Sequence, residues 1–239
     1  MSKDGMYKKE NFSVVALGGS IIISRKIQTG YLRRLRNFTQ KRIESGEKFI
    51  FVVGGGSVAR NYQRAAFSIV NISNEDKDWL GIHSTRLNAH LLRTIFNGMA
   101  YPIVLDDPEK PITQRDLKKY SLFIASGWRP GWSTDYIAFR LAHRFGAKRV
   151  VVATKISNVY DADIQTHKNA RPLKRISWKR YSKLLPSKIW YPGMGSPVDP
   201  VATEFAAKKK ISCVVLRGTN LKNLNRFLDG KKFEGTVIN

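Results

Sequence analysis

The sequence predicts an α/β fold, a three-layer sandwich in which helices cover both faces of a mostly parallel central sheet. Apolar, strand-like runs alternate with helix-like segments along nearly the whole chain. Some of these runs are continuously apolar, as in Phe49–Val53, which is typical of strands buried on both faces of a parallel sheet. A length of 239 residues suits one large domain of this kind.

In the first half of the chain, two short apolar runs each end at a glycine turn. Ser13–Leu17 precedes Gly18–Ser20, and Phe49–Val53 precedes Gly54–Gly56. Ser57 is expected to cap the helix that follows the second turn. The further elements expected here are a helix over Tyr31–Ile43 that ends before Gly46, the helix from Ser57 to about Val70, a helix over Trp79–Phe96 and a strand over Tyr101–Leu105.

The second half repeats the alternation of strand and helix. A strand over Ser121–Ala125 leads through the loop Ser126–Ser133 to a helix that ends near Phe145. Thr134 or Asp135 is expected to cap this helix, and Gly146 occupies its C-cap position. The remaining expected elements are strands over Arg149–Ala153 and Ile211–Leu216, helices over Asp199–Lys209 and Leu221–Leu228, and an edge strand over Gly235–Asn239.

Net charge is the unusual feature of the composition. The chain has 42 Lys and Arg against 18 Asp and Glu, a formal charge of +24. Such a field attracts polyanions, including nucleotides and RNA. A solvated basic surface is the simpler interpretation, and a nucleic-acid partner is the alternative.

Other features of the composition indicate a cytoplasmic protein. No apolar run is long enough to span a bilayer, and Met1–Asn11 lacks the apolar core of an export signal. The single cysteine, Cys213, lies in an expected strand, where we expect it to be buried. One cysteine cannot form a disulfide within the chain, which fits a reducing compartment.

Basic and aromatic residues are interleaved in one segment. From Ile164 to Val198 there are eight Lys or Arg and no Asp or Glu, with four Trp or Tyr among them. This pattern can bind a nucleic-acid strand through phosphate contacts and base stacking. The preferred interpretation is an amphipathic helix around Trp178–Leu185, with aromatic residues toward the core and lysines toward water.

Three glycine-containing loops follow expected strands and precede helices. They are Gly18–Ser20, Gly54–Ser57 and Gly127–Asp135. Glycine lets backbone N–H groups approach a phosphate, and the start of a helix adds partial positive charge. One such loop is more often a plain turn, but three at three strand ends favour phosphate binding. The P-loop and G-x-G-x-x-G motifs are absent, and the four histidines lack the spacing of metal ligands.

The order of motifs resembles that of the amino acid kinase family, and within it that of the archaeal-type uridylate kinases. The segments that carry the resemblance are Val14–Ser20 (VVALGGS), Phe51–Tyr62 (FVVGGGSVARNY), Asp78–Leu92 (DWLGIHSTRLNAHLL), Pro130–Ala142 (PGWSTDYIAFRLA), Val151–Asp163 (VVATKISNVYDAD) and Asp199–Pro200. They span nearly the whole chain. The resemblance implies the carbamate-kinase-like form of the α/β sandwich.

The resemblance also implies which residues bind nucleotide. On the ATP side it places Gly18, Gly19, Ser20, Gly55, Arg60, Thr154, Tyr160 and Asp163. On the UMP side it places Gly54, Asp78, Trp128, Arg129, Pro130, Gly131, Trp132, Ser133 and Thr134. Arg60 and Gly19 would act on the transferred phosphoryl group. An arginine suits this role because phosphoryl transfer depends mainly on positioning and electrostatics.

Three departures from the family pattern affect the expected activity. Many family members have lysine where this chain has Ala16, so another cation is needed; the candidates are Arg60, Arg86 and Lys155. Ser157 replaces an aspartate, which removes a carboxylate. Asn158 replaces glycine, a mild change because asparagine tolerates a left-handed backbone. Trp128, Arg129 and Trp132 are bulkier than the usual residues of the acceptor loop.

We therefore expect an enzyme that transfers a phosphoryl group from Mg²⁺-bound ATP to UMP, giving UDP and ADP. An ionised acceptor phosphate needs no strong general base. The expected lobes are an acceptor-binding part over about residues 1–148 and an ATP-binding part over about 149–239, in a homo-hexamer by resemblance. The alternatives are another phosphate or carboxylate acceptor, or a weakly active relative that binds nucleotide or RNA.

Overall fold

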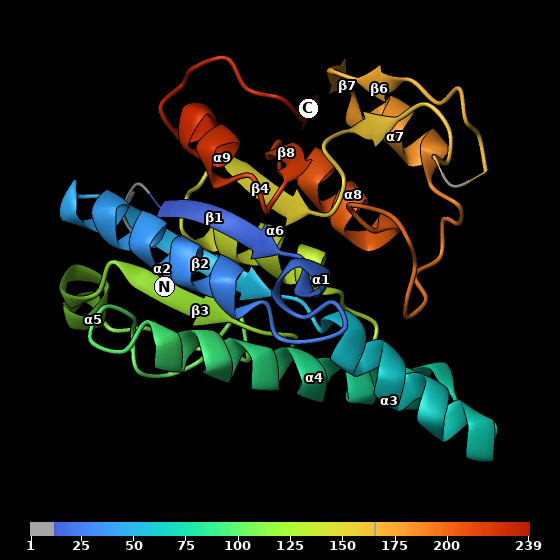
Figure 1. Cartoon of the computed structure of the whole chain (residues 1–239), viewed down its shortest axis with the longest axis horizontal. Coiled ribbons are helices and arrows are strands. Elements are labelled where there is room, and N and C mark those ends of the chain that lie inside the picture. Colours follow the sequence, from blue (N-terminus) through green and yellow to red (C-terminus); the bar gives the residue numbers. More distant parts are fainter. Residues whose placement is uncertain (1–11, 165) are drawn as a thin grey trace.

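A computed structural model describes residues 12–164 and 166–239 of the chain. Residues 1–11, where the sequence predicts no export signal, lie outside the described residues, as does Gln165. Within the described ranges, a seven-stranded sheet has the order β3-β2-β1-β4-β8-β9-β7, and β5 and β6 form a small second sheet. Helices cover both faces of the large sheet, which confirms the predicted α/β sandwich (Figure 1).

The strands of the large sheet are mostly parallel. Parallel pairs join β1 to β2, β1 to β4, β2 to β3, β4 to β8 and β7 to β9, and only the described pair β8–β9 in this sheet is antiparallel. The strands are β1 (Phe12–Leu17), β2 (Lys48–Val53), β3 (Leu122–Ala125), β4 (Arg149–Thr154), β5 (Val159–Tyr160), β6 (Pro172–Leu173), β7 (Arg175–Ile176), β8 (Ser212–Arg217) and β9 (Thr236–Ile238).

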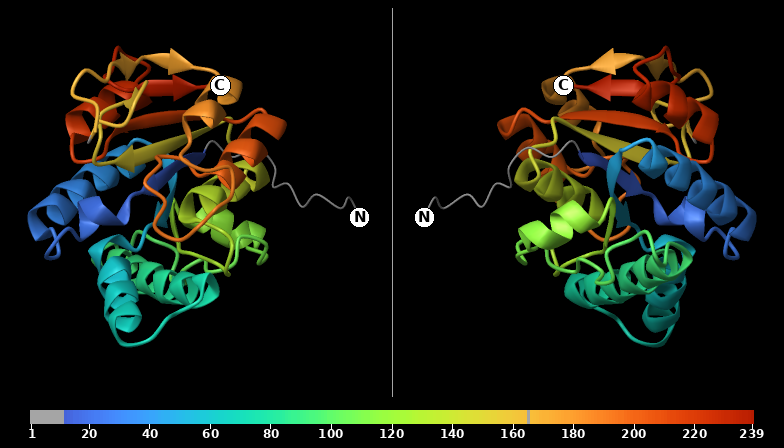
Figure 2. Two further views of the ribbon diagram at one scale, coloured as in Figure 1. Left: turned by 90° about the vertical axis from the view of Figure 1, so that its right-hand side faces the viewer. Right: turned by 90° about the vertical axis from the view of Figure 1, so that its left-hand side faces the viewer.

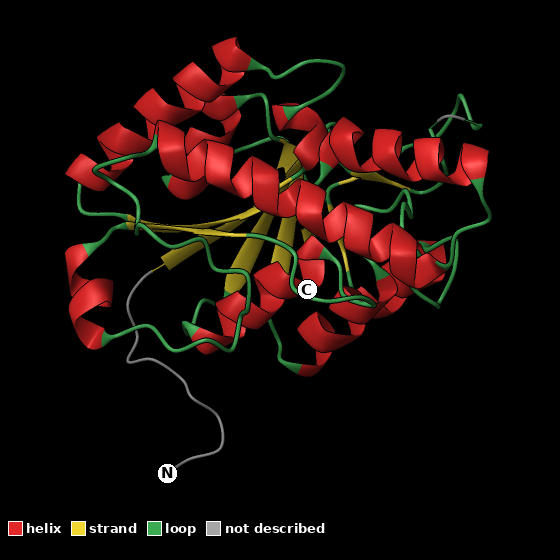
Figure 3. Ribbon diagram, turned by 90° about the horizontal axis from the view of Figure 1, so that it is seen from below, coloured by secondary structure: helices red, strands yellow, loops and turns green. Residues whose placement is uncertain are grey.

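The helices pack on the sheet in two layers, which Figure 3 shows on either side of the strands. They are α1 (Gly19–Ile22), α2 (Thr29–Glu44), α3 (Gly56–Ile69), α4 (Asn74–Ile95), α5 (Gln114–Lys119), α6 (Thr134–Arg144), α7 (Trp178–Leu184), α8 (Pro200–Lys208) and α9 (Leu221–Leu228). Figure 2 shows the C-terminal elements, coloured yellow to red, gathered above the N-terminal ones.

Two hydrophobic cores lie on opposite faces of the sheet because side chains alternate along each strand. In β1, Val14 and Ala16 join the core under α6, α7 and α8. Val15 and Leu17 join the core under α1, α2 and α4. Cys213 of β8 is fully buried, as predicted. The continuously apolar strands seen in the sequence are therefore those covered by helices on both sides.

Four local predictions are wrong. Tyr101–Leu105 makes only single parallel bridges at Ala100 and Leu105, since Pro102 lacks the N–H that a strand would need. The N-cap of α3 is Gly55 rather than Ser57, which bonds to the Ile23 carbonyl oxygen instead. The N-cap of α6 is Ser133 rather than Thr134 or Asp135. The C-terminal strand β9 is not at the edge, because β7 pairs beyond it.

The helix boundaries at α4 and α6 show how capping residues act. Helix α4 begins at Asn74, five residues before the predicted start, because Ser73 and Asp76 form a reciprocal capping box. At the end of α6, Gly146 has a positive φ of 69° and supports the left-handed cap that the sequence predicted. Helices α1 and α5 and strands β5 to β7 were not expected, since they are short.

The basic and aromatic segment folds as the preferred interpretation requires. Helix α7 begins after Ser177, whose side chain accepts a hydrogen bond from the Arg180 N–H. Trp178 and Tyr181 are buried on the sheet, while Lys179 and Lys183 face solvent. The aromatic residues of this helix are therefore core residues rather than a stacking platform for bases.

Candidate functional site

The first two glycine loops pack directly against each other at the carboxyl ends of β1 and β2. A side chain at Gly19 would lie 2.1 Å from the Gly56 nitrogen, and one at Gly54 would lie 2.6 Å from the Gly19 nitrogen. The Asn88 amide donates to the carbonyl oxygens of Gly54 and Gly55 at 2.9 and 3.0 Å. Glycine is therefore required here because two backbones meet, besides any need to admit a phosphate.

A cavity of about 330 Å³, called cavity A, opens beside these loops. It lies at the carboxyl edge of the sheet, where parallel α/β sheets bind ligands. Its described lining includes Gly55, Gly56, Arg60, Gln63, Asp78, Thr85, Gly127, Trp132, Ser133, Thr134, Asp135, Trp190, Met194, Ser196 and Asp199. Six of these residues were predicted from the sequence to bind nucleotide, namely Gly55, Arg60, Asp78, Trp132, Ser133 and Thr134. The others were not assigned to either nucleotide.

Asp78 connects three segments at the mouth of cavity A. Its carboxylate accepts a hydrogen bond of 2.7 Å from the Gly131 N–H. Burial raises the pKa of Asp78, and the hydrogen bond from the Gly131 N–H and the nearby Trp190 side chain partly offset this rise. The Asp78 carboxylate, on α4, thus lies between the loop before α6 and the segment before α8. Its oxygen lone pairs can accept a hydrogen bond from a hydroxyl group.

The starts of α6 and α8 meet at the back of cavity A. The Ser133 hydroxyl caps α6, accepting from the Tyr136 N–H at 3.0 Å, and donates to the Asp199 carboxylate. Asp199 in turn caps α8 by accepting from the Val201 and Ala202 N–H groups at 2.8 and 3.0 Å. The start of each helix is therefore fixed by the residue that caps it and by the contact between the two caps.

Asp135 and Asp199 both line cavity A and give it a pair of carboxylates. Burial and the nearby charge of Asp199 raise the pKa of Asp135 well above its usual value. Burial also raises the pKa of Asp199, although Ser133 and two backbone N–H groups oppose the rise. A pair of close carboxylates in an enclosed position is a strong site for a cation or a proton.

The three bulky residues of the acceptor loop, Trp128, Arg129 and Trp132, line two different cavities. Trp132 lines cavity A, whereas Trp128 and Arg129 line a separate open hollow with Arg86. The Arg129 guanidinium stacks 4.1 Å from the centre of the Trp128 ring and 5.1 Å from that of Trp132. Arg86 donates to the Trp128 carbonyl oxygen at 3.2 Å, which removes it from cavity A.

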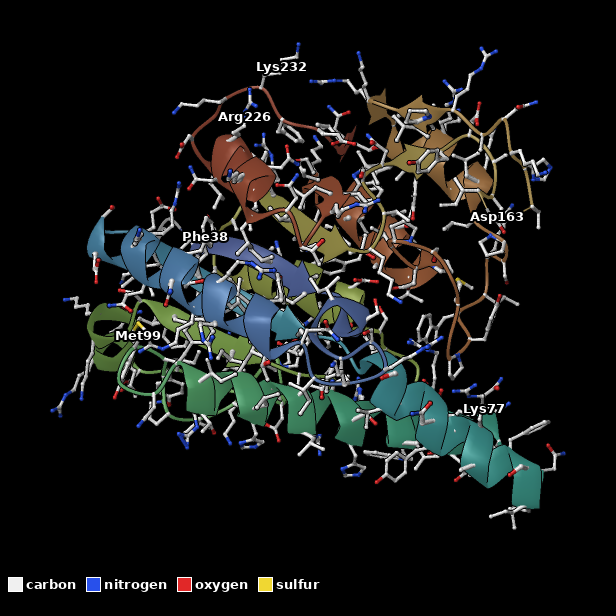
Figure 4. The ribbon with its side chains drawn as sticks, viewed as in Figure 1. Phe38, Lys77, Met99, Asp163, Arg226 and Lys232 are labelled. Carbon is white, nitrogen blue, oxygen red and sulfur yellow. The ribbon has the colours of Figure 1, made fainter. Side chains whose placement is uncertain are left out.

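A second cavity of about 360 Å³, called cavity B, lies in the C-terminal part of the chain. Its lining includes the predicted residues Tyr160 and Asp163, together with Ile156, Val159, Tyr181 and Leu185. Figure 4 shows Asp163 on the loop beyond β5. Thr154 does not line cavity B. It ends β4 beside Gly18, whose N–H donates to the Ala153 carbonyl oxygen at 2.9 Å.

Cavities A and B share Gly195 and Ser196, so they adjoin along the segment before α8. The sequence did not predict that this segment, which includes Trp190 and Met194, lines a nucleotide cavity, or that Asp135 and Asp199 form a pair. Both carboxylates had a signal in the sequence, since Asp135 lies in a quoted motif and Asp199 begins an Asp-Pro helix start that belongs to the same motif set. Gly18, Gly19, Ser20 and Gly54 line neither cavity, although they form the backbone floor next to cavity A.

The three departures from the family pattern have clear structural positions. Ala16 is buried in β1 within the core, and Arg60 is the one of the three proposed substitute cations that lines cavity A. Ser157 accepts a hydrogen bond from Arg217 at 3.2 Å. Asn158 does not use a left-handed backbone, contrary to the reason given for tolerating it; it is buried, and its amide lies 3.4 Å from the Thr236 hydroxyl oxygen.

The described residues contain neither a membrane-spanning helix nor a cluster of metal ligands. None of the helices in the described ranges combines the length and apolarity that crossing a bilayer requires. In the same ranges, no three or more His, Cys, Asp or Glu side chains gather as a metal-binding group.

Solved structures share this fold. A uridylate kinase from Archaeoglobus fulgidus matches with a TM-score of 0.77 and 28% identity, covering 95% of this chain and 100% of that one. A UMP kinase from Bacillus anthracis has the same TM-score at 18% identity, which supports the fold alone.

Sequence comparison gives the same result over nearly the full length. The uridylate kinase of Thermococcus sibiricus is 32% identical over 226 residues, which are 94% of this chain and 98% of that one. The uridylate kinase of Methanothrix thermoacetophila is also 32% identical, over 225 residues and with the same coverage. Residues 11–217 match the amino acid kinase family. The chain belongs to the amino acid kinase family.

Proposed function

We propose that this protein is a uridylate kinase that transfers the γ-phosphoryl group of ATP to UMP. The observation that carries the proposal is the pair of adjoining cavities at the carboxyl edge of the sheet, which share Gly195 and Ser196. Full-length similarity to uridylate kinases supports the choice of acceptor. Two cavities that meet allow the phosphates of two nucleotides to lie in line.

Cavity A is the acceptor site in this proposal. Asp78 accepts a hydrogen bond from a ribose hydroxyl, and the rings of Trp132 and Trp190 provide apolar walls for the base. Arg60, on the first turns of α3, directs its guanidinium toward the acceptor phosphate. Because the cavity also contains the starts of α3 and α6, backbone N–H groups add positive potential at its floor.

Cavity B is the donor site. Tyr160 packs against the adenine, and Asp163 accepts hydrogen bonds from the donor nucleoside, while the phosphates extend toward Ser196 and the glycine floor. The two lobes then have distinct roles, with about residues 1–148 holding the acceptor and about 149–239 holding ATP. The lobes remain joined by the continuous pairing of β1 with β4.

In the transfer step, an acceptor phosphate oxygen forms a bond to the γ-phosphorus while the bond to the β–γ bridging oxygen of ATP breaks. UDP and ADP result, and no proton must be removed from an ionised phosphate. Arg60 compensates charge that spreads over the transferred group, and the Gly19 and Gly55 backbone positions it. These residues act by position and charge, which explains the absence of a general base from the proposed mechanism.

Asp135 and Asp199 fit the requirements of a magnesium ion that arrives with ATP. Magnesium in nucleotide enzymes commonly has one or two carboxylate ligands, with phosphates and water completing its shell. It supplies charge neutralisation to the phosphates when bound. A magnesium ion held by Asp135 and Asp199 would relieve the repulsion that contributes to the raised pKa of Asp135.

A homo-oligomer, a hexamer by resemblance, is part of the proposal. Helix α3 extends beyond the rest of the fold (Figure 1), and large apolar side chains are exposed along it and its neighbour α4. They include Tyr62, Phe67, Ile69, Trp79 and Leu87. Apolar surface of this extent is typical of contacts between subunits. A cytoplasmic location stays a prediction from the sequence.

A coupled assay of ADP release across nucleoside monophosphates tests the acceptor. We expect turnover with UMP to exceed that with CMP, AMP, isopentenyl phosphate and acetylglutamate by about a hundredfold or more, as expected where a site pairs specific polar groups. Equal activity on another acceptor would instead favour the second candidate, a related kinase with an altered pocket, which the Trp128–Arg129–Trp132 stack motivates. No turnover with any acceptor would leave the third candidate, a nucleotide-binding relative without strong activity.

A further inference from the structure

A basic groove separate from both cavities lies at the C-terminal edge of the sheet. It has a volume of about 980 Å³ and is bordered by Lys174, Arg175, Lys222, Arg226 and Lys232. Its described lining has no residue in common with cavity A or cavity B. Figure 4 shows Arg226 and Lys232 on this face of the molecule, away from Asp163.

The cations of the groove come from three elements that meet there. Arg175 is on the edge strand β7, and Lys174 is the residue before it. Lys222 and Arg226 lie one turn apart on α9. Lys232 is on the loop that joins α9 to β9. Since residues four apart share a face of a helix, the two α9 cations point to the same side.

The groove is also rigid at its base. The Asn223 side chain is buried and makes two bonds to the backbone of Glu234, donating at 2.7 Å and accepting at 2.8 Å. Thr236 accepts a bond from the Val159 N–H at 2.8 Å and donates to the Leu173 carbonyl oxygen. The loop that carries Lys232 and Phe233 is therefore held in place before any ligand arrives.

The positive charge of the groove is not balanced by protein groups. Among the described residues, none of its five cations has an ion-pair partner, and Glu234 is the one acid in the described lining. By contrast, Arg42 on α2 is paired with both Glu47 and Asp229. A solvated basic surface would not require the cations to converge on a hollow, so this arrangement favours a bound anion.

We propose that this groove binds single-stranded nucleic acid through its phosphate backbone. Cations spread over three elements match a repeating chain of phosphates better than one phosphate group. The half-buried ring of Phe233 also lines the groove and offers a surface on which a base can stack. The proposal is independent of the kinase reaction, because it uses no residue of cavity A or cavity B.

Fluorescence anisotropy with a labelled oligouridylate of about 12 nucleotides tests the proposal on the full chain. The variant Lys222→Glu/Arg226→Glu is compared with Arg115→Glu/Lys118→Glu, which makes the same charge change on α5 at the opposite edge of the sheet. We expect the groove variant to weaken binding at least about tenfold and to reduce the slope of log K against log salt by about 1.4. The α5 variant should change the affinity about threefold at most, through the general field.

Two outcomes would overturn the proposal. One is equal weakening by the groove and α5 variants, which would indicate general attraction to a basic surface. The other is displacement of the oligonucleotide by UMP and ATP at saturating concentrations, which would place it in the cavities. Phe233→Leu, which keeps an apolar side chain against Phe227, should weaken binding about five- to tenfold without changing the salt slope. A far-ultraviolet circular dichroism spectrum and a Tm that match those of the wild type in all three variants confirm that they fold.

Discussion

Cavities A and B differ in how their walls are held. Cavity A is built from helix starts and the middle of α4, which are linked by bonds such as Asp78 to Gly131 and Ser133 to Asp199. Cavity B is built from a two-residue strand, one face of α7 and loops. The comparison suggests that discrimination between substrates depends on cavity A, because polar groups in fixed positions reject a ligand that leaves them unpaired.

The two cavities also differ in the charges that line them. Cavity A combines Arg60 with the carboxylates of Asp78, Asp135 and Asp199, whereas the charged residues in the described lining of cavity B are Asp161 and Asp163. In the proposed mechanism, phosphoryl transfer and the choice of acceptor thus depend on cavity A, and cavity B mainly holds the adenine base of ATP. Variants that affect one substrate without the other are the direct way to examine this division.

The largest effect is expected from Arg60→Ala. Removal of the guanidinium should lower turnover by about a hundredfold or more, since it faces charge that develops during transfer. Steady-state kinetics with UMP and ATP measure this loss. Arg64→Ala is the matched control, because Arg64 lies one turn further along α3 and bonds to Asn61 and the Arg60 backbone instead. Unchanged turnover in Arg60→Ala would remove Arg60 from the mechanism.

A smaller and more selective effect is expected from Asp78→Asn. The substitution keeps the shape of the side chain but replaces a charged acceptor, and should raise the KM for UMP about tenfold to a hundredfold. The KM for ATP should change little, since Asp78 lines cavity A alone of the two. Glu75→Gln, exposed on the first turn of α4, serves as the control. Equal changes in both KM values would contradict the division between the cavities.

The complementary variant is Tyr160→Ala. Loss of the ring should raise the KM for ATP about five- to tenfold and leave the KM for UMP unchanged, because base stacking contributes a modest free energy. Initial-rate measurements with each substrate varied separately give both constants. An increase confined to the KM for UMP would mean that the donor and acceptor cavities have been exchanged in the proposal.

The smallest expected effect concerns stability. The pKa of Asp135 is raised in the folded state, so between the ordinary and raised values the unfolded chain binds fewer protons than the folded one. Stability due to this group is therefore present at low pH and lost as pH rises through that window. Asp135→Asn should raise the Tm near pH 7 by about 2–4 °C while it lowers turnover.

Thermal melts at several pH values check this prediction. The gain from Asp135→Asn should shrink toward pH about 4, where the wild-type carboxyl group is protonated as well. A variant at Asp199 is a poorer probe because it also removes the N-cap of α8. A lower Tm for Asp135→Asn at neutral pH would show that the charged carboxylate stabilises the fold.

Much of the fold followed from local patterns, and the exceptions have local causes as well. Apolar runs located β1, β2, β3, β4 and β8, because a strand covered on both faces must be apolar throughout. The expected strand over Tyr101–Leu105 failed at Pro102, and β7 is too short for any pattern to reveal it. Helix caps were misplaced by one or two residues, since Ser, Thr and Asp stand side by side at the start of α6.

The sequence by itself determined the class of the fold, the glycine floor and six of the residues that line cavity A, namely Gly55, Arg60, Asp78, Trp132, Ser133 and Thr134. These depend on neighbours in the chain: alternation of strand and helix, glycine after a strand, and motifs in a fixed order. Only the tertiary structure decided that Asp135 and Asp199 line the same cavity, that Trp190 joins Asp78 in that lining and that five cations border one groove. Contacts between distant segments depend on how helices pack on the sheet, and no local pattern in one chain contains that information.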